Sequence, residues 1–157
     1  MTDRSITHAT FAIERVYPAA PARVFAAFAD PQLKARWFAA PESFEQGTFA
    51  LDFRVGGLEV NTGGPPGGPL YTYVATYAEI VPAERIVTSY TMDMDDTRIS
   101  VSVATFEFAA DGDGTRFVLT EHGAFLDGHD TPAAREHGSG ELLDALGEDL
   151  LREAGQA

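Results

Sequence analysis

Residues 131–154 carry the pattern that constrains this chain most, because they predict one long helix with a single apolar face. Thr131 is a suitable N-cap, and Pro132 is a suitable first helical residue because a proline there loses no hydrogen bond. A helix of this kind must bury its apolar face against another layer of structure. At about 100° per residue, that face would carry Arg135, Ser139, Leu142, Leu143, Leu146 and Leu150.

The layer that receives this helix is predicted to be a sheet. Strand candidates rich in Val, Ile, Thr, Tyr and Phe are separated by turn sequences such as Gly56-Gly57, Pro82-Ala83 and Asp95-Asp96. Residues 61–69 are rich in Gly and Pro, so a flexible loop is expected there. The predicted strands span residues 7–17, 44–52, 53–61, 71–80, 86–94, 99–109 and 115–122.

Two short helices are expected after the first strand. Pro21 fits the first turn of one helix, over residues 23–29, and Asp30 with Pro31 predicts a second that runs to about Trp37. The order of elements therefore predicts an α+β fold. In that fold a curved antiparallel sheet of six to seven strands surrounds the long C-terminal helix.

Composition narrows the classes of function. The 157 residues are 45% hydrophobic, which fits a single domain over residues 1–157. No apolar stretch is long enough to span a membrane, no signal core opens the chain, and there is no cysteine, so a cytoplasmic protein is expected. The net charge of −13 repels polyanions, so neither nucleic acid nor a membrane is expected as a partner.

Several segments carry a resemblance to a known family. The most specific is Tyr-Ala-Glu-Ile-Val-Pro-Ala-Glu-Arg-Ile-Val at 77–87, a strand–turn–strand signature, and the others lie at 20–31, 36–41, 53–57 and 121–128 with 142–150. Together they resemble the Hsp90 ATPase activator (AHSA1)-like group of the SRPBCC, or START-like, superfamily. The resemblance covers nearly the whole chain and implies a helix-grip fold, with a cavity between the sheet and the last helix.

One position departs from that family. Many relatives carry Gly-Trp early in the last helix, where this chain has Gly138-Ser139. A buried tryptophan covers roughly 150–250 Å², so Ser139 implies a larger or wetter cavity. The resemblance also implies dimers that form through sheet edges, so a homodimer is expected.

The leading hypothesis is a protein that binds a small apolar or aromatic ligand, without a cofactor, between the helix and the sheet. Tyrosines suit such a site because each combines an apolar ring with a hydroxyl. The loop 61–69 would control entry. The candidate ligand-binding residues are Trp37, Phe53, Tyr71, Tyr73, Tyr90, Phe106, Glu121, Arg135, Ser139, Leu142 and Leu146. Phe38 belongs to the same aromatic set, and each of these aromatic residues has plain core packing as its alternative.

Glu121 and Arg135 are the polar candidates. Strand periodicity places Glu121 on the same side as Phe117 and Leu119, and Arg135 lies on the apolar face of the helix. They are expected to be polar fixtures of the pocket, and a structural salt bridge or two rim side chains are the alternatives. A buried carboxyl can have a raised pKa and act as a general base. Glu121 is therefore a weak candidate for the catalytic residue of a cyclase- or hydrolase-like enzyme.

A third hypothesis, which rests on the resemblance alone, is an activator-like partner of a chaperone ATPase with a role in stress response. Metal chemistry is not expected, because His8, His122, His129 and His137 have no recognised ligand spacing and no HExxH motif is present. His137 and Glu141 are four residues apart on the predicted helix, so their side chains are expected to meet.

Overall fold

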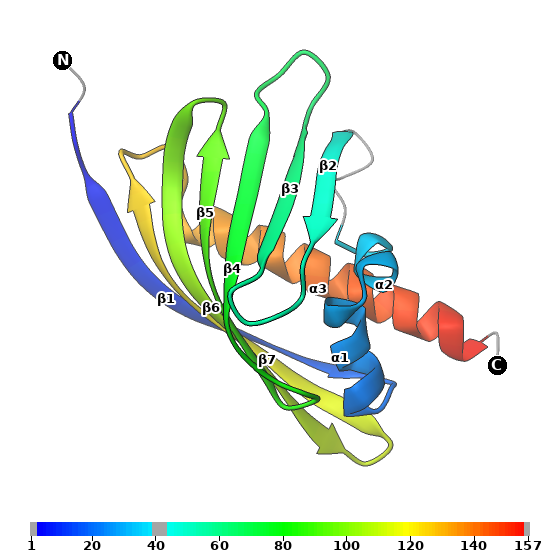
Figure 1. Cartoon of the computed structure of the whole chain (residues 1–157). Coiled ribbons are helices and arrows are strands. Elements are labelled where there is room, and N and C mark those ends of the chain that lie inside the picture. The colour runs from blue at the N-terminus through cyan, green and yellow to red at the C-terminus, as the bar shows by residue number, and fades with distance from the viewer. Residues whose placement is uncertain (1–2, 39–43, 156–157) are drawn as a thin grey trace.

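The computed structural model describes residues 3–38 and 44–155. A single seven-stranded antiparallel sheet curves around one long helix (Figure 1). Across the sheet the strand order is β1-β7-β6-β5-β4-β3-β2, so β1 and β2 form the two edges. The strands are β1 (Ile6–Tyr17), β2 (Glu45–Leu51), β3 (Leu58–Gly64), β4 (Tyr71–Val81), β5 (Arg85–Met94), β6 (Thr97–Asp111) and β7 (Gly114–Leu126).

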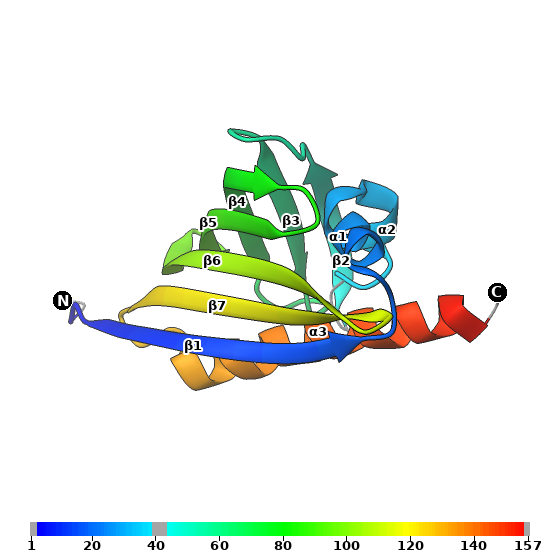
Figure 2. The ribbon, with the colours of Figure 1, turned by 90° about the horizontal axis from the view of Figure 1, so that it is seen from below.

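The helices are α1 (Pro21–Ala29), α2 (Pro31–Ala35) and α3 (Pro132–Gly155). The two short helices lie beside the C-terminal half of α3 (Figure 2). Asp30 caps α2 by accepting hydrogen bonds from the backbone N–H groups of Gln32 and Leu33. The predicted α+β helix-grip architecture is therefore confirmed, with both short helices directly after the first strand.

The boundaries of β3 differ from the prediction. Residues 53–57 turn rather than extend, since Gly56 has a φ of 83° and its N–H donates to the carbonyl of Tyr77 over 2.8 Å. The strand then continues to Gly64, because Thr62 and Gly63 pair with β4. Pairing with a neighbouring strand outweighs the weak strand preference of glycine. The predicted loop 61–69 therefore shortens to residues 65–70. Residues 39–41 of the aromatic segment at 36–41 lie outside the described residues.

Helix α3 supplies one wall of the core. Leu143, Leu146 and Leu150 have exposed fractions of 3%, 0% and 1%. Tyr17, the last residue of β1, contacts the helix, and its hydroxyl donates to the carbonyl of Leu143 over 2.8 Å. Thr131 caps the helix as predicted, since its hydroxyl accepts from the N–H of Ala134. No helix in the described part of the chain has the length and apolarity that a bilayer span requires.

Gly138→Ala is expected to raise the free energy of unfolding by about 0.5–1 kcal/mol. A Cβ added to Gly138 meets nothing within 4 Å, and the residue lies inside α3, where alanine is the better helix former. Gly140→Ala is the matched variant, because its Cβ would lie 3.3 Å from Nη2 of Arg15 and the gain should be smaller. Urea unfolding followed by circular dichroism measures both. A less stable Gly138→Ala variant would contradict this description of α3.

Candidate functional site

Arg135 is the centre of a buried polar group on the concave face of the sheet, which we call the Glu121 cluster. It consists of Tyr90, Ser100, Glu121, Asp130 and Arg135. The Arg135 guanidinium donates to the hydroxyls of Tyr90 and Ser100 and to the carboxylate of Asp130, each over 2.8 Å. The hydroxyl of Tyr90 in turn donates to Oε2 of Glu121 over 2.7 Å. The cluster therefore ties the first turn of α3 to β5, β6 and β7.

The predicted pair of Glu121 and Arg135 is bridged by Tyr90, whose hydroxyl accepts a hydrogen bond from Arg135 and donates one to Glu121. Nη1 of Arg135 lies 3.6 Å from Oε2 of Glu121, and the side chains are 9% and 3% exposed. Burial raises the pKa of the Glu121 carboxyl, while the Tyr90 hydrogen bond and the Arg135 charge act in the opposite direction. Burial, with the nearby Glu121 charge, also raises the pKa of Tyr90. Tyr90 therefore keeps its proton at neutral pH and holds the carboxylate as a donor.

A second buried ionic group, the Lys34 cluster, consists of Lys34, Glu59 and Tyr77. The Lys34 ammonium and the Tyr77 hydroxyl both donate to Oε1 of Glu59, each over 2.6 Å. Lys34 is 4% exposed and Glu59 is 0% exposed. Burial lowers the pKa of Lys34, and the Glu59 charge opposes that change. The ammonium also lies 4.5 Å from the ring centroid of Phe38.

The two carboxylate oxygens of Glu59 differ in their hydrogen bonding. Oε2 of Glu59 is buried and has no hydrogen-bond partner in the part of the chain that the structure describes. The same is true of the hydroxyl of Thr88, which lies opposite Tyr77 across the paired strands β4 and β5. Buried polar atoms nearly always have a partner, whether protein, water or ligand. These two atoms are therefore two of the points on the concave face where an added polar group would be accepted.

Tyr73 lies between the two clusters. Its ring centroid is 4.8 Å from that of Tyr90, and its strand position pairs with Asn61, two residues from Glu59 on β3. Burial, and then the negative charge of Glu59, raises the pKa of Tyr73 well above its usual range. The residue is only half-buried, and no described residue hydrogen-bonds its hydroxyl. Tyr73 thus offers a free, protonated hydroxyl.

The residues that the sequence proposed as cavity walls differ in burial and in contacts. Tyr73, Tyr90, Glu121 and Arg135 lie together, as just described. Phe53, Tyr71, Phe106, Ser139 and Leu142 are half-buried, so part of each side chain remains open to contact.

Two other predicted wall residues belong to the closed core. Trp37 is 5% exposed, packs against Phe28 with ring centroids 4.9 Å apart, and donates its indole N–H to the carbonyl of Ala27. Leu146 is 0% exposed. Their packing is that of ordinary core residues, the alternative that sequence periodicity left open.

Lys34 and Glu59 were not among the residues expected from the sequence. Lys34 comes from α2 and Glu59 from β3, so only tertiary structure brings them together. A signal did exist in part, because Glu59 alternates with Phe53, Val55 and Gly57 in the predicted strand 53–61 and a charged residue on such a face needs a partner. Nothing in the sequence identified that partner as Lys34.

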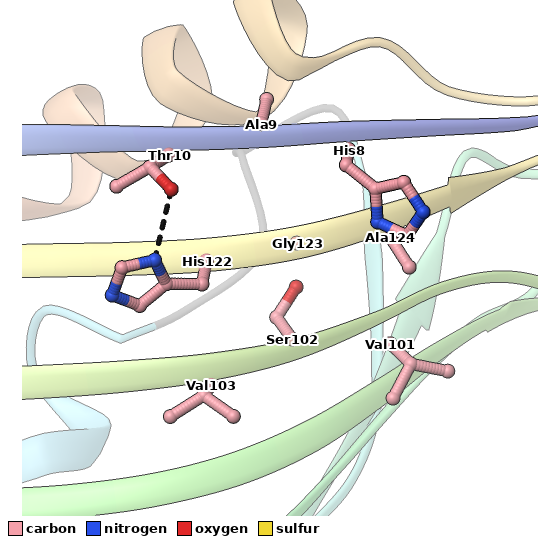
Figure 3. Close-up of a pocket in the computed structure, with 9 residues that line it drawn as sticks. All are labelled: His8, Ala9, Thr10, Val101, Ser102, Val103, His122, Gly123 and Ala124. Carbon is pink, nitrogen blue, oxygen red and sulfur yellow. Dashed lines mark hydrogen bonds between the residues drawn. The ribbon is translucent and has the colours of Figure 1, made fainter.

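The hollows on the molecular surface lie elsewhere. One, of about 490 Å³, is an open depression on the outer face of β1, β7 and β6 (Figure 3), where the Thr10 hydroxyl lies 2.8 Å from Nδ1 of His122. Another, of about 600 Å³, runs between the edge strand β1 and α3. Neither contains a residue of the two clusters. The first is lined by His8, Ala9, Thr10, Val101, Ser102, Val103, His122, Gly123 and Ala124.

The histidines form no metal centre in the structure. Within residues 3–38 and 44–155, no three His, Cys, Asp or Glu side chains are grouped so that they could hold a metal ion. His137 and Glu141 do meet, with Nε2 2.7 Å from Oε1, on the exposed face of α3. Their contact is the surface pair that their spacing predicts.

Known proteins resemble this chain in both sequence and fold. A family model described as Activator of Hsp90 ATPase homolog 1-like protein matches residues 18–150. An uncharacterized protein from Rhizobium leguminosarum is 43% identical, with a TM-score of 0.91 over 96% of this chain and 99% of that one. A protein from Rhizobium loti is 45% identical, with a TM-score of 0.85 over 92% and 98% of the two chains. No curated protein matches the chain.

More distant structures share the fold alone. The AHSA1-like protein from Aeromonas hydrophila is 22% identical, with a TM-score of 0.65 over 95% of this chain and 96% of that one. At this level of identity the comparison bears on the path of the backbone and not on the residues of the site.

Proposed function

We propose that this chain, which belongs to the family of activator of Hsp90 ATPase homolog 1-like proteins, binds a small molecule on the concave face of its sheet. The observation that carries the proposal is the unpartnered hydroxyl of Tyr73, between two buried ionic clusters. A few polar groups among aromatic side chains are typical of small-molecule sites, where the polar groups orient the ligand.

The apolar part of the ligand would lie against half-buried side chains. Leu142 of α3 packs against the core without being fully covered, and the half-buried Ser139 would leave room that a larger side chain would fill. The neighbouring strands contribute further half-buried rings. This wall would comprise Phe53, Tyr71, Phe106, Ser139 and Leu142, with Trp37 and Leu146 behind it.

Native mass spectrometry of the purified protein, followed by titration of naphthalene derivatives in a calorimeter, tests the proposal. Tyr73→Phe is expected to weaken binding of an oxygen-bearing derivative by about 5- to 10-fold, because one hydrogen bond is lost. Ser89→Ala is the matched control: it removes a hydroxyl from the exposed outer side of the neighbouring strand β5 and should leave affinity nearly unchanged. A protein that neither carries a ligand nor binds any derivative would refute the proposal.

A chaperone ATPase remains a second candidate partner, favoured by the description of the matching family model. Such a partner would connect the chain to stress response. The test is co-precipitation with a purified Hsp90-type ATPase and a measurement of its ATPase rate. An interaction or a changed rate would support this role, and the absence of both would dispose of it.

An enzyme with Glu121 as its base has less support. The carboxylate is 2% exposed and already accepts a hydrogen bond from Tyr90, with Arg135 beside it, so its contacts suit a fixed anchor better than a base that meets substrate. Glu121→Gln separates the two roles. A folded variant with unchanged ligand turnover or binding would remove Glu121 from any catalytic role.

Homodimer formation through a sheet edge also stays a prediction. The sheet order leaves β1 and β2 at the two edges, and an unpaired edge strand can accept another strand. Sedimentation equilibrium measures the state of the protein directly. The cytoplasmic location and the single domain over residues 1–157 likewise stay predictions.

A further inference from the structure

We infer that the ligand is a neutral aromatic compound with a hydroxyl group, of the phenol kind, which donates its hydrogen bond to Oε2 of Glu59. The inference rests on the proposed function and adds the chemical class of the ligand.

The first argument is the unequal use of the two Glu59 oxygens. Oε1 accepts from both Lys34 and Tyr77, whereas Oε2 has no donor in the described chain. Glu59 is 0% exposed, so bulk water does not satisfy the second oxygen. An unsatisfied buried oxygen of a carboxylate is strongly unfavourable, and more so than a neutral one. The site therefore calls for a hydrogen-bond donor at Oε2.

The second argument is charge. Lys34 already neutralises Glu59, with Nζ 2.6 Å from Oε1, so a cationic ligand is not required for charge balance. An anionic carboxylate or phenolate group has no proton to donate, so it would leave Oε2 of Glu59 without a donor. A neutral donor is the class that both clusters accept, because it satisfies the free oxygen without burying another charge.

The third argument comes from the surrounding rings. Phe38 lies against the Lys34 ammonium, and Tyr73 packs on Tyr90, so flat apolar surfaces flank the cluster. Aromatic ligands pack well on such rings. A phenolic hydroxyl has a further advantage, because it can donate to Glu59 while its oxygen accepts from the free hydroxyl of Tyr73.

The test compares compounds of one shape on the wild-type protein. 2-Naphthol donates a hydrogen bond, whereas 2-methoxynaphthalene only accepts one. Calorimetric titration is expected to give about 10-fold or tighter binding for 2-naphthol, as for a hydrogen bond to a charged group. Equal affinities would overturn this inference and leave the proposed function standing, since a bound water would then satisfy Oε2. Binding of neither compound would overturn both.

Glu59→Gln makes the test sharper. Lys34 and Tyr77 both donate to the position of Oε1, so the glutamine carbonyl must take that position and its NH₂ group must replace Oε2. The preference should then reverse, with 2-naphthol losing affinity and the acceptor 2-acetylnaphthalene gaining it. Glu107→Gln, on the exposed outer side of β6, is the matched control and should keep the wild-type order.

Circular dichroism establishes that both variants fold. A folded Glu59→Gln protein that still prefers 2-naphthol would overturn the inference. If that variant does not fold, the wild-type comparison of 2-naphthol with 2-methoxynaphthalene decides alone.

Discussion

Leu146→Ala is expected to lower the free energy of unfolding by about 2–5 kcal/mol, the range for a buried leucine whose removal leaves a cavity. Leu146 is 0% exposed, between the equally buried positions Leu143 and Leu150 on the inner face of α3. The helix has little intrinsic stability of its own, since Gly138, Gly140 and Gly147 interrupt it. Its attachment to the sheet therefore depends on these leucine side chains.

Leu151→Ala is the control for that experiment. Leu151 lies five residues after Leu146 in the same helix, and it is 60% exposed. Its replacement should change the free energy of unfolding by less than about 0.5 kcal/mol. Urea unfolding of both variants gives the comparison. Equal effects at the two positions would mean that α3 does not bury the face described above.

Arg135→Met is expected to lower the free energy of unfolding by roughly 3–5 kcal/mol, as when one partner of a buried ion pair is removed. The change deletes three hydrogen bonds of the guanidinium, to Tyr90, Ser100 and Asp130. It also leaves Glu121 buried without a nearby positive charge. Arg98→Met is the control, since Arg98 is 52% exposed in its pair with Asp93 and such surface pairs contribute less than about 1 kcal/mol.

The loss in Arg135→Met should depend on pH. Burial already raises the folded-state pKa of Glu121 above its ordinary value of 4.5, so the folded protein holds that proton more tightly than the unfolded chain. The stabilisation from this proton is present below the unfolded-state pKa and is lost as the pH rises through the folded-state pKa. Without Arg135 the folded-state pKa rises further, so that loss extends to higher pH.

Unfolding at about pH 5 and about pH 8 measures this dependence. The destabilisation of Arg135→Met relative to wild type should be larger at the higher pH. The double variant Arg135→Met/Glu121→Gln should lack the difference, because the titrating carboxyl is gone. A single variant equally destabilised at both values would show that Glu121 does not carry the effect.

Most of the architecture could be predicted because it depends on local patterns. The inner face of α3 follows from helical periodicity, and the meeting of Glu121 with Arg135 follows from combining strand and helix periods. The predicted start of β3, at residue 53, was wrong for a physical reason. Gly56 takes a positive φ that turns the chain, so the turn sequence Gly56-Gly57 stands before the strand and not inside the predicted span 53–61.

The candidate site was less predictable than the fold. The Lys34 cluster depends on how α2 approaches β3, and no sequence period connects two elements of different type. The aromatic residues were difficult for another reason, because the sequence does not distinguish a core ring from one that lines a site. Trp37 fills the core, whereas Tyr73 keeps a free hydroxyl, and only the packing around each ring separates them.

The sheet order has a consequence for how the protein is made on the ribosome. Strands β2 to β6 are each paired with the strand that follows in sequence, so this meander needs only short-range contacts. The edge strand β1, by contrast, must await β7, and α3 is synthesised later still. A nascent chain can therefore pair strands β2 to β7 early, but their concave face stays uncovered until α3 is made. We expect no ligand to be retained until this last helix has emerged.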